Sequence, residues 1–364
     1  MGNDQTVSVQ QKDGPYKINY KIKMPPFFTN PVGLGHATRD IAIAEKLKSM
    51  GKEIIFITGA GAFSLISKKD FSVLNLYEPV KFYIKSGELK EPFKWLMKYL
   101  SYYKKCKMIA EDVLKKYDGL IVSDEDFASI AIGEKMNRKR ILITDITETH
   151  FTTSLLASIV EKKMNKIMHK MIDKCNYVII PEYGDDKDNL VYVGPIVREV
   201  SADRNTLRKK FGFNKKTIIV SVGGTDAGRY LIEKSLEVYR RLGKKMDIDL
   251  IIVPGPLVKV TDSAEFHNAG FVDNLHEYIY AADLVISLAG RSTMDESILY
   301  GTPGIFIPIK NHFEQQEGAK RLGYRYEDIF RLDTLIEEKL GSRSNVVVNS
   351  NGAEKAAKLI LKLF

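Results

Sequence analysis

Short runs of β-branched and other apolar residues alternate with stretches of helix-like apolar spacing along almost the whole chain. Such alternation is typical of βα units that build parallel sheets. In the first half, strands are predicted at residues 52–58, 119–124, 139–145 and 176–182, and helices at 40–50 and 129–137. The pattern therefore predicts a doubly wound α/β domain in this half.

A second series of the same kind follows a Pro-containing and then polar stretch at residues 191–205. Its strands are predicted at 216–224, 248–256, 283–290 and 303–309. Because 364 residues exceed what one hydrophobic core usually holds, we expect two domains, residues 1–198 and 199–364. The predicted last helix, 351–364, is expected to belong to the second domain or to pack back across the boundary onto the first. Ligands of open α/β sheets bind beyond the carboxyl ends of the strands, which predicts a site in the cleft between the domains.

The segment 21–31 should be the first strand of the chain, but it contains two adjacent prolines, Pro25 and Pro26. Proline lacks the N–H group that a sheet ladder needs. We therefore expect this strand to lie at an edge, to be displaced, or to be interrupted.

The composition, 44% hydrophobic and 28% charged, is that of an ordinary globular protein. The net charge of +9 favours an anionic partner, which could be nucleic acid, a phospholipid surface or a phosphorylated small molecule. Cys106 and Cys175 show no metal-ligand spacing, so a reducing, cytoplasmic location is expected. No run of about 18 apolar residues occurs, which predicts a soluble or peripheral protein.

A Gly-rich turn at residues 31–40 contains Gly33, Gly35 and His36 and runs into a helix expected to begin near Thr38. Free N–H groups at such a helix start suit a phosphate or a developing anion. A dinucleotide-binding turn is disfavoured, since Thr38 replaces its third glycine and the next strand ends without an acidic ribose ligand. A purely structural turn with a capping histidine stays open.

Two further motifs lie in the second half. Gly223, Gly224 and Thr225 follow a predicted strand and form a second anion cradle. Between residues 271 and 320, one strand is followed by Gly290, Ser292, Thr293 and Glu296, and the next by Asn311, His312, Gln315 and Gln316. Helix-start hydroxyls bind phosphate, a carboxylate can hold ribose hydroxyls, and amides can read sugar hydroxyls. The motifs together predict a nucleotide-sugar pocket.

These motifs resemble those of the GT-B glycosyltransferases of the family that includes the bacterial peptidoglycan N-acetylglucosaminyltransferase, that is, glycosyltransferase family 28 and family 1-like enzymes. The resemblance implies two Rossmann-like domains facing across a cleft, with the acceptor in the N-terminal and a UDP-sugar donor in the C-terminal domain. It implies inverting transfer of a hexose or N-acetylhexosamine. The spacing around Gln315 departs from the family pattern, which leaves the sugar open.

The resemblance also implies roles for single residues. The donor-binding residues would be Arg198, Gly223, Gly224, Thr225, Val272, Gly290, Ser292, Thr293, Glu296, Gln315 and Gln316. Among them, the glycines and hydroxyls would hold the diphosphate and the backbone near Val272 would read the base. Glu296 would take the ribose, the two glutamines the donor sugar, and Arg198 would approach the nucleotide. The loop with Gly33, Gly35 and Thr38 would face the acceptor.

Transfer needs a base for the acceptor hydroxyl, and His36 is the candidate. Asp124 at the end of a predicted strand is expected to orient the imidazole, as in some GT-B enzymes. A capping His36 and a solvated Asp124 remain alternatives. Asp124-Glu125-Asp126 also spells a metal-binding D-x-D pattern, which we interpret as coincidence. We expect no metal and no cofactor, because helix dipoles replace the metal in this fold.

Two basic, aromatic stretches, 91–108 and 154–174, are predicted to be amphipathic helices. They either rest on an anionic membrane or merely cover the core with a solvated lysine face. We expect a lipid-linked acceptor and a peripheral location. A UDP-sugar epimerase of the same fold is the main alternative function. A basic nucleic-acid-binding protein is a weaker one, and no nucleic-acid partner is expected because no such module is recognisable.

Overall fold

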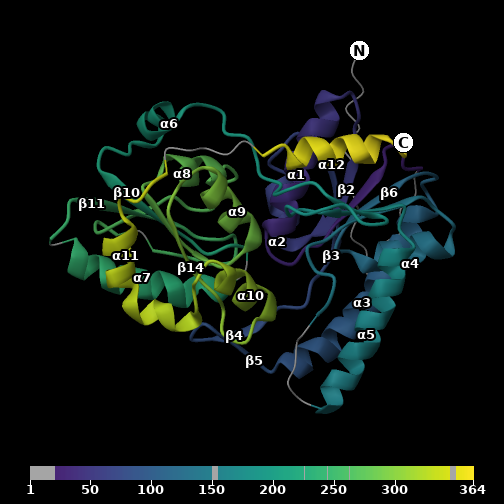
Figure 1. Ribbon diagram of the computed structural model, residues 1–364, viewed down its shortest axis with the longest axis horizontal. Coiled ribbons are helices and arrows are strands. Elements are labelled where there is room, and N and C mark those ends of the chain that lie inside the picture. Colours follow the sequence, from purple (N-terminus) through teal and green to yellow (C-terminus); the bar gives the residue numbers. More distant parts are fainter. Residues whose placement is uncertain (1–20, 150–154, 225, 244, 262, 345–349) are drawn as a thin grey trace.

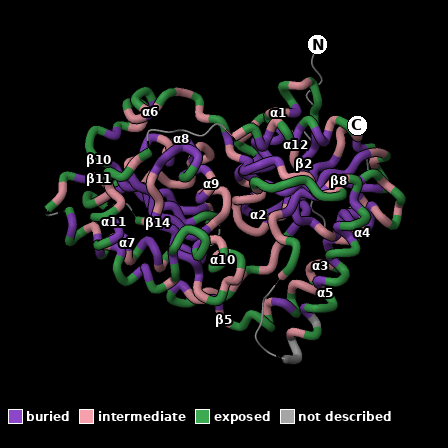
Figure 2. The backbone as a smooth tube through the Cα atoms, viewed as in Figure 1, coloured by how far each residue is buried: buried purple, intermediate pink, exposed green. Residues whose placement is uncertain are grey.

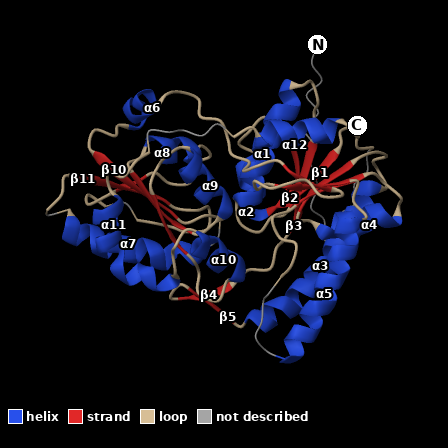
Figure 3. Ribbon diagram, viewed as in Figure 1, coloured by secondary structure: helices blue, strands red, loops and turns tan. Residues whose placement is uncertain are grey.

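The computed structural model describes residues 21–149, 155–224, 226–243, 245–261, 263–344 and 350–364. Two α/β units lie side by side, each built on one parallel sheet with helices on its faces (Figures 1 and 3). The strands form the buried centre of each unit and the exposed residues lie mainly on the surrounding helices and loops (Figure 2). The predicted fold class, two doubly wound parallel-sheet domains, is confirmed.

Within the described residues, the N-terminal sheet has seven parallel strands in the order β3-β2-β1-β6-β7-β8-β9. These strands are β1 (Pro26–Thr29), β2 (Ile55–Gly59), β3 (Ser72–Tyr77), β6 (Ile121–Asp124), β7 (Arg140–Ile143), β8 (Tyr177–Ile180) and β9 (Leu190–Tyr192). The helices are α1 (Gly35–Ser49), α2 (Ala60–Ile66), α3 (Pro92–Leu114), α4 (Phe127–Lys135) and α5 (Leu155–Asp173). Both faces of this sheet are covered, which is why its strands are continuous apolar runs.

The C-terminal sheet, over the same described residues, has five parallel strands in the order β12-β11-β10-β13-β14. They are β10 (Lys216–Ser221), β11 (Ile248–Val253), β12 (His267–Asn268), β13 (Leu284–Leu288) and β14 (Gly304–Ile307). The helices are α6 (Arg204–Phe211), α7 (Arg229–Leu242), α8 (Leu275–Ala281), α9 (Arg291–Leu299), α10 (Phe313–Arg321), α11 (Leu332–Lys339) and α12 (Gly352–Leu361), with short 3₁₀ turns η1 (Asp226–Gly228) and η2 (Tyr326–Arg331). The strand order reverses beside β1 in the first sheet and beside β10 in the second, and such switch points are where ligands of these sheets bind.

The first strand differs from the prediction. β1 pairs with both β2 and β6, so it lies in the centre of the sheet and is neither at an edge nor displaced. Pro26 occupies the first strand position, where a missing N–H is tolerated, and the carbonyl of Pro25 still accepts a bond from Ile55 N at 3.0 Å. Phe27 and Phe28, which follow, are fully buried. The prolines therefore start the strand and do not break it.

Two segments cross between the units. The hairpin β4 (Tyr83–Lys85) and β5 (Glu88–Lys90) leaves the N-terminal unit, and Leu89 joins the core of the C-terminal one. In return, α12 packs against α1 and contributes Ala356 and Ile360 to the N-terminal core (Figure 1). The division near Arg198 stays a prediction, and these exchanged segments tie the two units together.

The helices α3 and α5 extend together beyond the body of the N-terminal unit (Figure 1). Among the described residues, no helix is both long and apolar enough to cross a membrane.

Candidate active site

A cavity of about 480 Å³ lies in the cleft between the two units and is lined by residues of both. Its floor is made by the loops that follow β1 and β6 on one side and β10 and β13 on the other. The two sheet switch points therefore face each other across one cavity, as the cleft prediction required.

The two predicted glycine loops are in contact. A Cβ atom on Gly224 would lie 2.7 Å from the Leu34 side chain and 2.9 Å from the backbone carbon of Gly33. Ser292 at the start of α9 donates its hydroxyl to the carbonyl of Gly35 at 2.9 Å. The N-terminal loop therefore touches both phosphate-binding candidates of the C-terminal unit, and only glycine allows an approach this close.

Helix α1 begins at Gly35, slightly earlier than the expected start near Thr38. The Thr38 hydroxyl returns a bond to the carbonyl of Gly35 at 2.8 Å, so its side chain supports the first turn. The N-cap position is occupied by Leu34, without a side-chain cap, so His36 is not a capping histidine. Gly33, Gly35, His36 and Thr38 all line the cavity.

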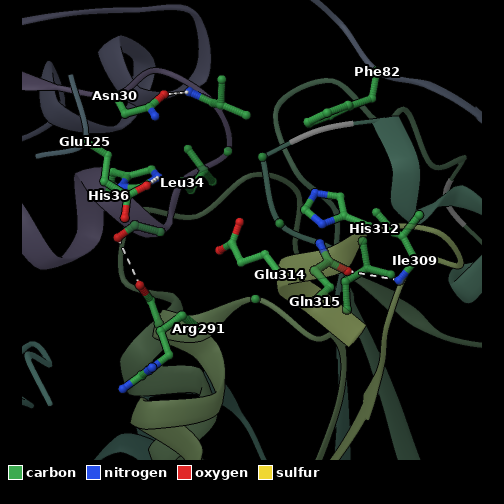
Figure 4. A pocket seen from close by; sticks show the side chains of 18 of the residues that line it. Asn30, Leu34, His36, Phe82, Glu125, Arg291, Ile309, His312, Glu314 and Gln315 are labelled. Atoms are coloured by element: carbon green, nitrogen blue, oxygen red, sulfur yellow. Dashed lines mark hydrogen bonds and ion pairs between the residues drawn. The ribbon is translucent and has the colours of Figure 1, made fainter. Parts of the chain in front are cut away.

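His36 and Asp124 form a pair, with 2.8 Å between Nδ1 and Oδ1 (the His36 side chain is labelled in Figure 4). Arg39 donates from Nε and Nη2 to the two oxygens of the same carboxylate, at 2.5 Å each. Asp124 is fully buried, which excludes the alternative of a solvated loop acid. Arg39 was missed by the sequence analysis, although its position three residues after His36 places both on one helix face.

The charges of this group shift its pKa values strongly. Burial lowers the pKa of His36, but Asp124 and Glu125 outweigh burial and raise it to about 9. Burial acts to raise the pKa of Asp124, but Arg39 and His36 outweigh it and hold that pKa far below the usual range. Asp124 is therefore ionised throughout the physiological range and favours the imidazolium form of His36.

Two further carboxylates reach the cavity that the sequence analysis did not assign. Glu125 Oε2 lies 3.7 Å from His36 Nε2, and Asp145 Oδ1 lies 3.4 Å from Arg39 Nη1. Asp145 ends the predicted strand 139–145, and a carboxylate at a strand end beside the switch point was the signal available for it.

The two aspartates of the D-x-D pattern, Asp124 and Asp126, do not point towards one common site. Asp126 turns away to cap α4, accepting from Ala128 N at 3.3 Å and from the Tyr77 hydroxyl at 2.8 Å. Within the described chain, His36, Asp124 and Glu125 do have ligand atoms within 4.8 Å of one another. Both oxygens of Asp124, however, already accept from Arg39, and the positive guanidinium opposes a cation there. The expectation that no metal is needed stays a prediction.

Arg198 and Glu296 form a buried ion pair at the donor side of the cavity. Nε and Nη2 of Arg198 donate to the two carboxylate oxygens at 2.9 and 3.3 Å, and Nη1 donates to the carbonyl of Asp273 at 2.9 Å. Val272 lines the cavity beside that carbonyl. The structure thus brings Arg198, Val272 and Glu296 together, as predicted. The ion pair between Arg198 and Glu296 was not predicted from the sequence.

The remaining predicted donor residues divide in three ways. Those that line the cavity are Gly223, Gly224, Gly290, Ser292, Thr293 and Gln315. Thr225 lies outside the described residues. Gln315 Oε1 accepts from Ile309 N at 3.1 Å, so the carbonyl end of its amide is pinned (Figure 4). Gln316, one residue further along α10, is exposed and does not line the cavity, because successive helix residues point about 100° apart.

An arginine of the C-terminal unit joins the units electrostatically. Arg291, the first residue of α9, donates from Nη1 to Glu182 of the N-terminal unit at 2.6 Å and from Nε to Asp295 at 2.8 Å. The same guanidinium lies 4.0 Å from Asp145. This bridge holds the start of α9 against the carboxylates around His36.

One wall of the cavity is apolar and aromatic. Phe82 stacks on Trp95 with ring centroids 4.8 Å apart, and Trp95 stacks on Tyr99 at 5.2 Å. Helix α5 contributes Met164 and Met168 to the same lining. The wall therefore combines helices α3 and α5, the pair that extends from the N-terminal unit.

Part of the C-terminal half matches a known domain family. Residues 217–358 match the glycosyltransferase family 28 C-terminal domain. An uncharacterized glycosyltransferase of Methanopyrus kandleri is 25% identical over 264 residues, 66% of this chain and 74% of that protein. The UDP-N-acetylglucosamine–N-acetylmuramyl-(pentapeptide) pyrophosphoryl-undecaprenol N-acetylglucosamine transferase of Clostridium tetani is 26% identical over 287 residues, 76% of this chain and 75% of its own.

Solved structures agree on the fold. The kitacinnamycin glycosyltransferase superposes with a TM-score of 0.60 and 13% identity, covering 93% of this chain and 98% of its own. The UDP-GlcNAc 2-epimerase of Neisseria meningitidis does so with a TM-score of 0.58 and 13% identity, covering 93% and 100%. These structures confirm the GT-B fold. The family match and the named relatives confirm the predicted enzyme class and the resemblance to the peptidoglycan N-acetylglucosaminyltransferases.

Proposed function

We propose that this glycosyltransferase transfers a hexose or N-acetylhexosamine from a UDP-sugar to a hydroxyl of a lipid-linked acceptor, with inversion. One observation carries the proposal. The glycine loop and the α9 start of the matched domain share a single cavity with the His36–Asp124 pair of the other unit. The name of the Clostridium tetani relative, which describes transfer from a UDP-sugar to an undecaprenol-linked acceptor, supports the substrate classes.

The donor is proposed to lie on the C-terminal side. The backbone N–H groups of the Gly223–Gly224 loop and of the first turn of α9 would hold the diphosphate and stabilise the charge that develops as it leaves. Arg198 lines the same cavity, where Glu296 balances its charge, so the positive potential on the diphosphate comes from the two helix and loop starts. With this potential in place, the enzyme needs no metal ion. The amide nitrogen of Gln315, whose oxygen is already bonded, would read the donor sugar.

His36 is proposed as the base. Asp124 at Nδ1 fixes the tautomer that leaves Nε2 as the proton acceptor, and it stabilises the imidazolium that forms on transfer. Because the pKa of His36 is raised to about 9, the neutral imidazole is a minor form at pH 7 and becomes more abundant as the pH rises. Turnover should therefore increase from pH 7 towards pH 9.

The acceptor is proposed to enter along the apolar wall. The extended helix pair exposes large apolar side chains, with Phe93 and Met97 of α3 at 55% and 52% exposure and Ile159 and Ile167 of α5 at 66% and 49%. Lysines are interspersed with them along both helices. Apolar side chains among basic ones suit the surface of an anionic bilayer. We propose peripheral binding of this helix pair to the cytoplasmic face of a membrane, where the two free, buried cysteines stay reduced.

Sedimentation with vesicles tests this surface. We expect binding to vesicles that contain anionic phosphatidylglycerol and little binding to pure phosphatidylcholine. A Phe93→Ser, Met97→Ser double variant should lose most of the binding. If the wild-type protein bound to neither kind of vesicle, the membrane proposal would be excluded.

A UDP-sugar epimerase is the second candidate, because such an enzyme needs additional carboxylates in the cleft, and Glu125 and Asp145 supply them. Product analysis separates the two reactions. Transfer releases UDP only when a polyprenyl-linked sugar acceptor is present, whereas an epimerase converts UDP-N-acetylglucosamine without acceptor. Calorimetry with UDP, UMP and a single-stranded oligonucleotide tests the donor class, and binding of the oligonucleotide alone would revive the nucleic-acid hypothesis.

A further inference from the structure

The residue after Asp124 is held in an unusual conformation. Glu125 has φ +50°, in the left-handed region of backbone conformation that residues other than Gly, Asn and Asp rarely adopt. Such a backbone is strained and persists where the surroundings impose it, often at functional sites. Its backbone N–H bonds to the carbonyl of Ile143 at 3.1 Å, which anchors the strained residue to β7.

The carboxyl group of Glu125 is fixed by one oxygen, and its other oxygen faces His36. Oε1 accepts from the Thr144 hydroxyl at 3.0 Å and from the backbone N–H of Asp145 at 3.3 Å. Oε2 faces Nε2 of His36 at 3.7 Å, and both side chains line the cavity (Figure 4). Two hydrogen bonds to Oε1 therefore orient Oε2 of Glu125 towards Nε2 of His36, the ring nitrogen that does not contact Asp124.

We propose that Glu125 is a further catalytic residue, which contacts the acceptor hydroxyl together with His36 and receives the Nε2 hydrogen bond after proton transfer. The proposal rests on the transfer function proposed above. The 3.7 Å between Nε2 and Oε2 is too long for a direct hydrogen bond, but a hydroxyl oxygen beside this gap can lie within reach of both atoms.

The proton and electron balance of the step is complete. The acceptor oxygen bonds to the anomeric carbon of the donor while the bond from that carbon to the diphosphate oxygen breaks, and its electron pair leaves with UDP. The hydroxyl proton moves to Nε2 of His36. The resulting imidazolium then lies between Asp124 at Nδ1 and Glu125 at Nε2, and its positive charge in turn favours the ionised form of Glu125.

The charges around the two groups are defined. His36 faces Asp124, Glu125 and the guanidinium of Arg39, while Glu125 faces His36, Arg39 and Asp145. From the C-terminal unit, Arg291 approaches this group through Asp145. Burial and the neighbouring Asp145 raise the pKa of Glu125 well above its usual range, against the opposing charges of His36 and Arg39. Glu125→Gln leaves Asp124 and Arg39 in place, so a change in the titration of His36 can be assigned to Glu125.

Steady-state kinetics of Glu125→Gln against pH tests the proposal. We expect kcat to fall roughly 100-fold, the lower range for a residue in general base catalysis, with the KM for the UDP-sugar unchanged. We also expect the acidic limb of kcat/KM for the acceptor to shift to lower pH, because one of the two carboxylates that favour the imidazolium is gone. A purely structural role would change stability without moving this limb.

Further variants keep the test decisive. Glu125→Asp retains the charge but withdraws it from the hydroxyl, so kcat should fall while the limb moves less than in Glu125→Gln. Thr144→Val removes one of the two hydrogen bonds to Oε1 and should lower kcat by a smaller factor. It replaces Glu125→Gln if that variant does not fold. Glu134→Gln, on the outer side of α4 and paired with Lys174, is the matched control and should behave as the wild type.

The outcomes separate the two proposals. Full kcat and an unmoved acidic limb in Glu125→Gln, with an active wild type, would overturn the role of Glu125 and leave the transfer function intact. A wild type that releases no UDP with any polyprenyl-linked acceptor, but epimerises the donor, would instead refute the transfer function.

Discussion

The buried pair of Arg198 and Glu296 makes the sharpest prediction for the donor side. The two residues are only 4% and 2% exposed, and they meet through two hydrogen bonds of 2.9 and 3.3 Å. Replacing Glu296 by Ala would leave the guanidinium buried opposite a cavity, with the Asp273 carbonyl as its remaining partner. Breaking a pair of this kind by removing one partner costs about 3 to 5 kcal/mol.

This loss should be visible as a lower melting temperature. For a domain of about 150 to 250 residues, 1 kcal/mol shifts Tm by about 2 to 4 °C, so Glu296→Ala should melt roughly 6 to 20 °C below the wild type. Differential scanning fluorimetry measures the shift, and calorimetry with UDP measures donor affinity. We expect UDP binding to weaken as well, since Glu296 is the proposed ribose ligand.

A double variant separates stability from binding. Arg198→Met combined with Glu296→Leu removes both charges and fills the space, which should restore most of the melting temperature, since apolar replacement of a buried pair is often neutral. UDP affinity should stay low in this variant. A melting temperature of Glu296→Ala within about 1 °C of the wild type would refute the energetic argument, and wild-type UDP affinity in the double variant would refute the donor role of the pair.

Four further predictions follow from the cavity. The folded-state pKa of His36 is raised to about 9, so its contribution to stability is complete below its unfolded pKa of about 6.5 and is lost as the pH rises to 9. The free energy of unfolding measured in urea should therefore fall by on the order of 3 kcal/mol over this range. In His36→Gln this fall should be much smaller. Gly224→Ala should weaken UDP binding and lower turnover, because its Cβ would push against Leu34 and separate the loops, whereas Gly212→Ala on the surface should affect stability alone. Trp95→Ala should raise the acceptor KM and leave the donor KM unchanged, with equal effects on both contradicting the acceptor wall. Addition of EDTA should leave turnover intact, and a loss that Mg²⁺ restores would show that a metal is required.

Several parts of the fold could be predicted because local patterns determine them. Strand β10 (Lys216–Ser221) was recognisable as a β-branched run with a glycine turn behind it, and the switch-point rule then placed both glycine loops at a cleft. Short or irregular strands were not predicted. In β3 (Ser72–Tyr77) apolar and polar residues alternate too weakly. The hairpin β4–β5 is stabilised by the other unit, because the backbone of Lys310 forms hydrogen bonds with Gly87 and Leu89.

The candidate site divides in the same way. Residue types and their spacing indicated His36 and the donor motifs, because glycine turns and helix starts are local features, and the family resemblance pointed to Asp124. Contacts across long stretches of chain were decided only by tertiary structure. The pairing of Arg198 with Glu296 joins residues 98 positions apart, and that of Arg39 with Asp124 joins residues 85 apart.

The central place of β1 shows the same limit most clearly. Its two prolines argued locally for an edge strand, yet the burial of Phe27 and Phe28 between two neighbouring strands outweighs the missing donors at the start of the strand. The sequence by itself determined the two series of βα units and indicated the glycine turns, His36 and the donor motifs as candidates. Only the packed structure decided that Glu125 faces His36, because that contact depends on a strained backbone and on the hydroxyl of Thr144 from the neighbouring strand end.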